Sequence, residues 1–335
     1  MVPVALAPAH QRTPCWSVFC AALNAVTPLP GWAWTAFFAF IAALLALDLG
    51  LFRRGAHEVR MGEALTWCGV WVGLALAFDA LLWSWLGPEP AQQFLAAYLV
   101  ELCMSVDNIF VFILVFAWFQ TAPAWRHRVL FWGIIGAVVM RSAFLLAGLG
   151  VLHRFHWVIY LFGAFLVYTG VKMAWTKKSA DGIHPEKNPA VRLFRRFFPV
   201  AANFDGAKFF TRESGRRVAT PLLLVLLVVE TTDLIFALDS LPAVLAITGS
   251  AFVALTSNIF AILGLRSLYF ALSGVMQLFR FLKPGLAVIL VFIGLKMLVS
   301  RWVEISTAHA LGVIAAVLAV SVLLSVLVRE PLKQG

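Results

Sequence analysis

Long apolar stretches dominate this chain and limit what it can fold into. A helix that crosses a bilayer needs about 20 predominantly apolar residues. A helix also satisfies its backbone hydrogen bonds within one segment, as the hydrocarbon region requires. The sequence therefore predicts an all-α polytopic membrane protein with about nine transmembrane helices. The predicted spans are 32–52, 63–86, 93–119, 129–151, 156–176, 221–241, 253–274, 284–301 and 309–328.

The composition excludes a soluble protein. Hydrophobic residues make up 62% of the chain and charged residues 13%, which leaves too few charged groups to cover a wet surface. The net charge of +10 falls mainly in the connections between the predicted spans, where anionic lipid headgroups are its natural partners. We therefore expect the lipid bilayer as a partner and expect no nucleic acid. No sequence pattern indicates a protein partner.

Lys and Arg are distributed very unequally between the two sides of the predicted membrane. Alternate connections hold most of the 26 basic residues, and the connection 177–220 alone holds ten. The opposite side holds only Arg12, Arg154 and Arg301. Because positively charged connections stay in the cytoplasm, we predict that the N-terminus lies outside and the C-terminus lies in the cytoplasm.

Two of the predicted spans carry acidic residues at the same internal spacing. Each motif has a carboxylate, five intervening residues, a second carboxylate and then a small polar residue. The first motif consists of Glu101, Asp107 and Asn108, and the second consists of Asp233, Asp239 and Ser240, with Glu230 just before it. A charge at a helix centre costs about 2.5 to 3.5 kcal/mol, so these residues indicate a functional site for a cation.

The likeness of the two motifs continues downstream as an internal repeat. Arg141-Ser142 recurs as Arg266-Ser267, and Gly-Val-Lys-Met at 170–173 recurs as Gly-Leu-Lys-Met at 294–297. The three spans of 93–176 thus recur as the three spans of 221–301. Because each copy crosses the membrane an odd number of times, the second copy must enter the membrane from the opposite side. An inverted 3+3 repeat of this kind is typical of secondary transporters, with the binding site near the midplane. Duplication that serves stability alone is the alternative.

The predicted organisation has six parts. They are an N-terminal extension (1–31), two peripheral transmembrane helices (32–86), the first three-helix repeat (93–176), a basic cytoplasmic loop (177–220), the inverted second repeat (221–301) and a last transmembrane helix (309–328). The two repeats are expected to form the core.

Helix geometry limits how the carboxylates of one motif can act together. On a straight helix Glu101 and Asn108 share a face, while Asp107 points about 120° away. Asp233 and Ser240 repeat this relation. Both helices are therefore either central, with polar space on two faces, or broken, for which Pro242 provides a cause.

Carboxylate, amide and hydroxyl oxygens form a hard ligand set, which suits Mn²⁺, Mg²⁺ or Ca²⁺. Metal and protons would compete for these groups, which is the basis of exchange. The candidate metal ligands are Glu101, Asp107, Asn108, Glu230, Asp233 and Asp239, with Asp48 and Ser240 as further candidates. Arg141 and Arg266 lie inside spans and are expected to balance charge, although a buried structural ion pair is the alternative to a role in transport.

The same residues resemble the TerC family of integral membrane proteins, and most closely its Alx-type branch. The signatures are Ser-Val-Asp-Asn-Ile-Phe at 105–110, Glu-x-x-Asp-Leu-Ile-Phe-Ala-Leu-Asp-Ser-Leu-Pro-Ala-Val at 230–244, and Thr-Ser-Asn-Ile-Phe-Ala-Ile-Leu-Gly-Leu-Arg-Ser-Leu-Tyr-Phe at 256–270. The resemblance runs from about Trp32 to the last span. One departure is Leu102-Cys103, where the relatives usually have Lys-Ser.

The resemblance implies a manganese exporter of the inner membrane and an association with tellurite resistance. It also implies that seven acidic or polar residues match motif residues of the family, namely Glu101, Asp107, Asn108, Glu230, Asp233, Asp239 and Asp48. No permanently bound cofactor is expected, and neither a Walker A pattern nor a protease motif indicates an enzyme. The favoured interpretation is secondary active export of a divalent metal, Mn²⁺ before Ca²⁺, from cytoplasm to periplasm, with proton coupling as an open question. The alternatives are a membrane scaffold of a metal or tellurite stress-response complex and a Ca²⁺/H⁺ exchanger.

Overall fold

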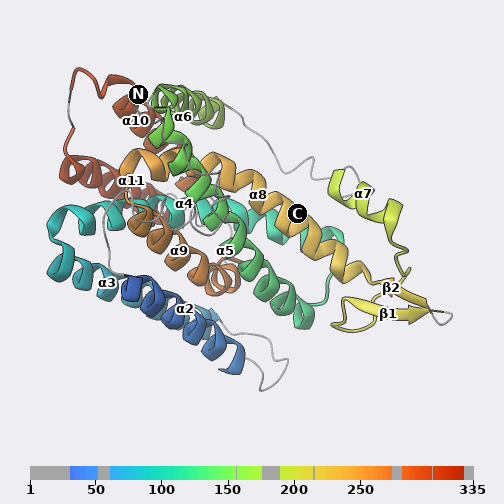
Figure 1. Ribbon diagram of the computed structural model, residues 1–335. Coiled ribbons are helices and arrows are strands. Elements are labelled where there is room, and N and C mark those ends of the chain that lie inside the picture. Colours follow the sequence, from blue (N-terminus) through green and yellow to red (C-terminus); the bar gives the residue numbers. More distant parts are fainter. Residues whose placement is uncertain are drawn as a thin grey trace, which may run out of the picture.

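Long helices form nearly the whole molecule, and a small hairpin lies at one end of the bundle (Figure 1). The computed structural model describes residues 31–51, 61–155, 157–175, 189–213, 216–273, 281–303 and 305–327. Within these ranges, eight helices are long and apolar enough to cross a membrane. The prediction of an all-α polytopic membrane protein is therefore confirmed.

Each of the eight helices overlaps one predicted span, and their ends differ from the predicted bounds by up to six residues. They are α3 (Met61–Leu86), α4 (Pro88–Trp118), α5 (Pro123–Arg154), α6 (Val158–Trp175), α8 (Pro221–Ile247), α9 (Ala251–Ser273), α10 (Leu282–Val299) and α11 (Thr307–Leu327). The remaining predicted span corresponds to α2 (Gly31–Leu51), an apolar helix whose side chains are described as far as Leu44.

Proline residues mark the start of three of the central helices. Pro88, Pro123 and Pro221 begin α4, α5 and α8, where the missing N–H group leaves no intrahelical bond unmade and φ is already helical. Gly87, just before α4, has φ of 93°, a conformation that favours glycine. Pro242 does not break α8, which continues to Ile247. Both motif helices are therefore continuous, and a break does not bring the two carboxylates of a motif together.

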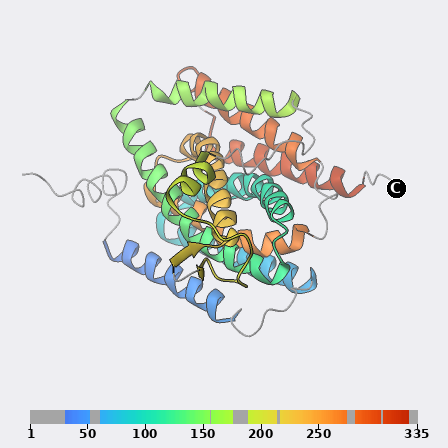
Figure 2. The ribbon, with the colours of Figure 1, turned by 90° about the vertical axis from the view of Figure 1, so that its right-hand side faces the viewer.

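The most enclosed helix is α9. In its membrane-length window 94% of the residues are buried, against 17% in α3 and in α11. Helix α9 packs against α3, α4 and α5, while α4 and α5 both pack against α8. Helices α2 and α6 lie on opposite sides of the bundle, with α4 and α8 between them (Figure 2). The motif helices α4 and α8 thus lie between the outer helices of the bundle.

Helices α6 and α10 approach each other closely through small residues. A Cβ atom on Gly163 would lie 3.0 Å from the Gly294 carbonyl oxygen, and one on Gly170 would lie 2.8 Å from the Ala287 carbonyl oxygen. Because later residues of α6 meet earlier residues of α10, the two helices are antiparallel. Corresponding helices of the two predicted repeats contact each other, namely α4 with α8, α5 with α9 and α6 with α10. The inverted relation of the two repeats itself stays a prediction.

The basic segment 177–220 contains structure that the sequence did not predict. Helix α7 (Pro189–Phe197) packs against α8, and strands β1 (Phe210–Glu213) and β2 (Arg216–Ala219) form an antiparallel hairpin. The backbone of Ala219 bonds to Ala201 and Pro199, and the Thr220 hydroxyl donates to the Lys208 carbonyl at 2.6 Å. These contacts fasten the hairpin to the beginning of α8 (Figure 1).

Candidate functional site

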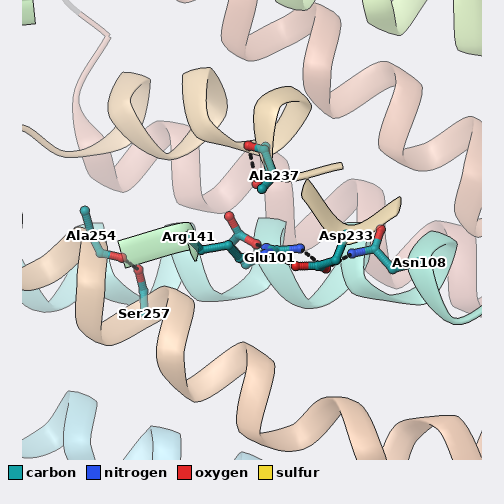
Figure 3. Close-up of polar contacts among 8 residues, drawn as sticks. Glu101, Asn108, Arg141, Asp233, Ala237, Ala254 and Ser257 are labelled. Atoms are coloured by element: carbon teal, nitrogen blue, oxygen red, sulfur yellow. Dashed lines mark hydrogen bonds and ion pairs between the residues drawn. The ribbon is translucent and has the colours of Figure 1, made fainter. Parts of the chain in front are cut away.

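Three charged side chains from three helices meet in the interior of the bundle. Glu101 of α4, Arg141 of α5 and Asp233 of α8 are 0%, 3% and 3% exposed. Arg141 donates from Nη1 to Glu101 Oε2 at 2.7 Å, from Nη2 to Asp233 Oδ1 at 2.9 Å and from Nε to Asp233 Oδ2 at 3.2 Å. The planar guanidinium thus holds Asp233 at two points and Glu101 at a third (Figure 3). We call Glu101, Arg141 and Asp233 the ionic cluster.

Asn108 lies beside the ionic cluster. Its Nδ2 is 3.3 Å from Asp233 Oδ1. With the amide turned over, its oxygen accepts from Arg141 Nη2 at 3.0 Å and its nitrogen donates to the Met104 carbonyl at 3.1 Å, which satisfies both ends. Either orientation confirms that Glu101 and Asn108 share one face of α4, as their spacing predicted.

Two glycines bring α5 close enough to α8 for Arg141 to reach Asp233. A Cβ atom on Gly133 would lie 3.4 Å from Val229 Cγ1, and the Glu230 carboxylate lies against Gly136 with no room for a Cβ atom. The sequence analysis missed this role. The signal was Gly-Ile-Ile-Gly at 133–136, because small residues in apolar helices mark close helix contacts.

The ionic cluster carries a net charge of −1 when all three groups are ionised. Glu101 Oε1 is buried without a hydrogen-bond partner among the described residues, and so is the hydroxyl of Ser105, one turn further along α4. Buried polar groups normally have partners, because leaving one unsatisfied costs about 1 to 3 kcal/mol. The site therefore retains negative charge and unused oxygen atoms, which suit a cation or a water molecule.

The second carboxylate of each motif faces elsewhere. Asp107 is half-buried and interacts electrostatically with Lys283, at the start of α10. Asp239 is also half-buried and interacts electrostatically with Lys172 of α6. The angle of about 120° between the two carboxylates of a motif accounts for this division.

Glu230 is a further carboxylate on α8, near Asp233. It is half-buried one turn before Asp233 on α8, and its carboxylate faces α5 at Gly136. Its Oε2 atom is buried without a hydrogen-bond partner in the described part of the chain. Glu230 is thus a second buried carboxylate at the contact between α5 and α8.

The remaining candidates lie outside the ionic cluster. Ser240 is buried and donates to the Ala237 carbonyl of its own helix at 3.4 Å. Arg266 is buried within α9, where it is 4% exposed. The side chain of Asp48 lies outside the described residues.

The predicted ligands do not form one metal constellation in this conformation. Among the described residues, no three His, Cys, Asp or Glu side chains lie close enough together to hold one ion. Glu101, Asn108 and Asp233 come together, and Arg141 fills the place between the two carboxylates. Metal binding by any of these residues stays a prediction.

Comparisons with known proteins agree with the sequence signatures. The profile of the integral membrane protein TerC family matches residues 86–333. An uncharacterized membrane protein of Myxococcus xanthus is 49% identical over 294 residues, which cover 88% of this chain and 92% of that protein. The membrane-bound redox modulator Alx of Escherichia coli K12 is 44% identical over 308 residues, 89% of this chain and 94% of that protein. No solved structure matches. The chain therefore belongs to the TerC family of integral membrane proteins.

Proposed function

We propose that this protein is a secondary active transporter that exports a divalent cation, Mn²⁺ as the first candidate, from the cytoplasm across the inner membrane. In this proposal the N-terminus lies outside, and protons move in exchange for the metal. The observation that carries the proposal is the pair of buried carboxylates, Glu101 and Asp233, held by one arginine in the interior of the helix bundle. Ionisable groups at such positions are expensive and usually mark ion pathways.

The origin of the two carboxylates supports transport. They come from α4 and α8, the corresponding first helices of the two predicted repeats, and these helices pack against each other. A site at the interface between repeats is the usual arrangement in transporters with inverted repeats. The antiparallel contact of α6 with α10 agrees with such an inversion. Rocking of one repeat against the other would then expose the site to either side in turn.

The chemistry of the surrounding oxygens supports a hard cation. Besides the two carboxylates, the Asn108 amide lies on the same face of α4 as the Ser105 hydroxyl, which has no hydrogen-bond partner among the described residues. Such a set suits Mn²⁺, Mg²⁺ or Ca²⁺. Because carboxylates must be ionised to bind metal, metal entry would release protons and metal exit would favour their return.

The name of the Alx relatives mentions redox modulation. The free thiols that the structure describes are those of Cys68, which is half-buried, and Cys103, which is buried on α4. Thiols buried in apolar surroundings are inert. The described cysteines therefore favour cation transport over thiol chemistry at this site.

Transport by purified protein in liposomes tests the proposal. Wild-type protein should move Mn²⁺, and an imposed pH gradient should change the rate. Asp233→Asn and Glu101→Gln should each lower the rate by about tenfold or more, because each removes a charge that faces the ion. Glu89→Gln, at an exposed position on the same helix α4, is the matched control and should retain transport. Full Mn²⁺ transport by both cluster variants would refute the proposed site.

A further inference from the structure

Arg141 occupies the place that a transported cation would need. Its guanidinium donates three hydrogen bonds of 2.7 to 3.2 Å, which engage both oxygens of Asp233 and one oxygen of Glu101. An arginine side chain is a fixed positive charge with no acceptor. While these bonds persist, a metal ion can reach neither Asp233 oxygen without meeting a like charge.

We infer that Arg141 is a tethered competitor of the transported cation, so that the guanidinium and the metal hold the Glu101–Asp233 pair in turn. The inference rests on the proposed function, because it concerns the same site. The competition follows from charge. The two carboxylates carry two negative charges, which one divalent ion neutralises, whereas metal and arginine together would leave a buried excess of +1. Charge repulsion in a dry site makes this joint state unfavourable.

A second position is available to the displaced guanidinium. Glu230 lies one turn before Asp233 on α8, and its carboxylate faces α5 at Gly136, five residues before Arg141. Arg141 already contacts Asp233, and Asp233 and Glu230 are three residues apart and therefore neighbours on α8. The buried Oε2 atom of Glu230 has no hydrogen-bond partner among the described residues. Glu230 is therefore placed to receive Arg141 when metal takes Asp233, which keeps the buried cation paired.

A purely structural ion network would behave differently. Removing Arg141 from such a network would weaken folding and would leave metal binding unchanged or weaker. Removing a competitor instead strengthens metal binding, even where the metal-free protein becomes less stable. The sign of the change in Mn²⁺ affinity thus separates the two roles.

Equilibrium Mn²⁺ binding to the purified full-length protein in detergent is the measurement, together with the rise in Tm that Mn²⁺ produces. Arg141→Gln should bind Mn²⁺ about tenfold or more tightly than the wild type, because a positive charge leaves the site. Its Tm should rise more steeply with Mn²⁺, since a ligand stabilises according to its affinity. Arg141→Lys keeps the positive charge but cannot donate two hydrogen bonds to Asp233 in the same geometry, so a smaller increase in Mn²⁺ affinity is expected. Arg128→Gln, at an exposed position on the same helix, is the matched control and should leave Mn²⁺ affinity unchanged.

Glu230→Gln tests the second position. Without the Glu230 carboxylate, Arg141 loses the second position proposed for it, so Mn²⁺ should bind more weakly than to the wild type. In the double variant Arg141→Gln with Glu230→Gln, this weakening should disappear. Such non-additivity is expected only when the two side chains act on each other. Equal weakening by Glu230→Gln in both backgrounds would exclude the transfer of Arg141 to Glu230.

The outcomes separate this inference from the proposed function. If folded Arg141→Gln and Arg141→Lys bind Mn²⁺ no more tightly than the wild type while Asp233→Asn abolishes binding, the competition is overturned and the cation site stands. If Asp233→Asn binds Mn²⁺ as the wild type does, the cation site itself is wrong, and the competition is overturned with it.

Discussion

Two ion pairs of similar length lie in very different parts of this molecule. In the ionic cluster, Arg141 is 2.7 Å from Glu101, and the exposures of the two side chains are 3% and 1%. At the hairpin, Lys208 is 3.0 Å from Asp205, and the exposures are 65% and 41%. Surface pairs contribute about 0 to 1 kcal/mol because water competes for both partners. In a buried pair, removing one partner leaves the other as an uncompensated charge away from water. Loss of one carboxylate should therefore lower the stability of the protein much more at the ionic cluster than at the hairpin.

The largest effect is expected from Asp233→Ala, which leaves the Arg141 guanidinium without its two-point partner. Breaking one side of a buried pair costs about 3 to 5 kcal/mol. The free energy of unfolding in detergent should fall by that amount. Asp205→Ala is the matched change at the surface pair and should leave the same free energy nearly unchanged. Equal losses in the two variants would erase the contrast between the two regions.

A smaller effect is expected where glycine allows close contact between helices. In Gly294→Val, the new Cβ atom would lie 2.7 Å from the Gly163 carbonyl oxygen and 2.9 Å from the Val167 nitrogen. Overpacking of this kind usually costs about 1 to 3 kcal/mol. The same substitution at Gly312 of α11, where a Cβ atom meets nothing within 4 Å, is the control. A comparable Tm for both variants would show that α6 and α10 can move apart without a loss of stability.

The smallest effect concerns pH at the surface pair. Hydrogen bonds from Thr211, at 2.7 Å, and from Lys208, at 3.0 Å, lower the pKa of Asp205 from its ordinary value of 3.8. A carboxylate whose pKa is lowered by folding stabilises the folded state above the unfolded pKa, and this contribution is lost as pH falls through the folded pKa. Protection of hairpin amides from hydrogen exchange should therefore decline below about pH 4.

Asp205→Asn measured at the same pH is the control, because intrinsic exchange rates then cancel. The difference in protection between the wild type and Asp205→Asn should be full near neutral pH and vanish in acid. A difference that persists at low pH would show that the carboxylate charge does not organise this loop.

The helices were predictable because the hydrocarbon region imposes length and apolarity on every span. The common face of Glu101 and Asn108 was also predictable, because it depends only on the helical period. Helix α7 and the hairpin were not predicted, because their stability depends on contacts with α8 and with residues 199–201 rather than on any local pattern. The close approach of α5 to α8 was missed for the same reason, although Gly133 and Gly136 marked it.

The sequence by itself determined that this is a polytopic helical membrane protein of the TerC family with costly carboxylates in two apolar helices. Hydropathy and motif spacing are local properties, so no tertiary contact was needed to establish either. The tertiary structure decided which of those carboxylates meet. Packing of α4, α5 and α8 joins Glu101 to Asp233 through Arg141 and leaves Asp107 and Asp239 outside the ionic cluster. Which side chains share a site depends on how helices rotate and pack against one another, and this is set by contacts far apart in the chain.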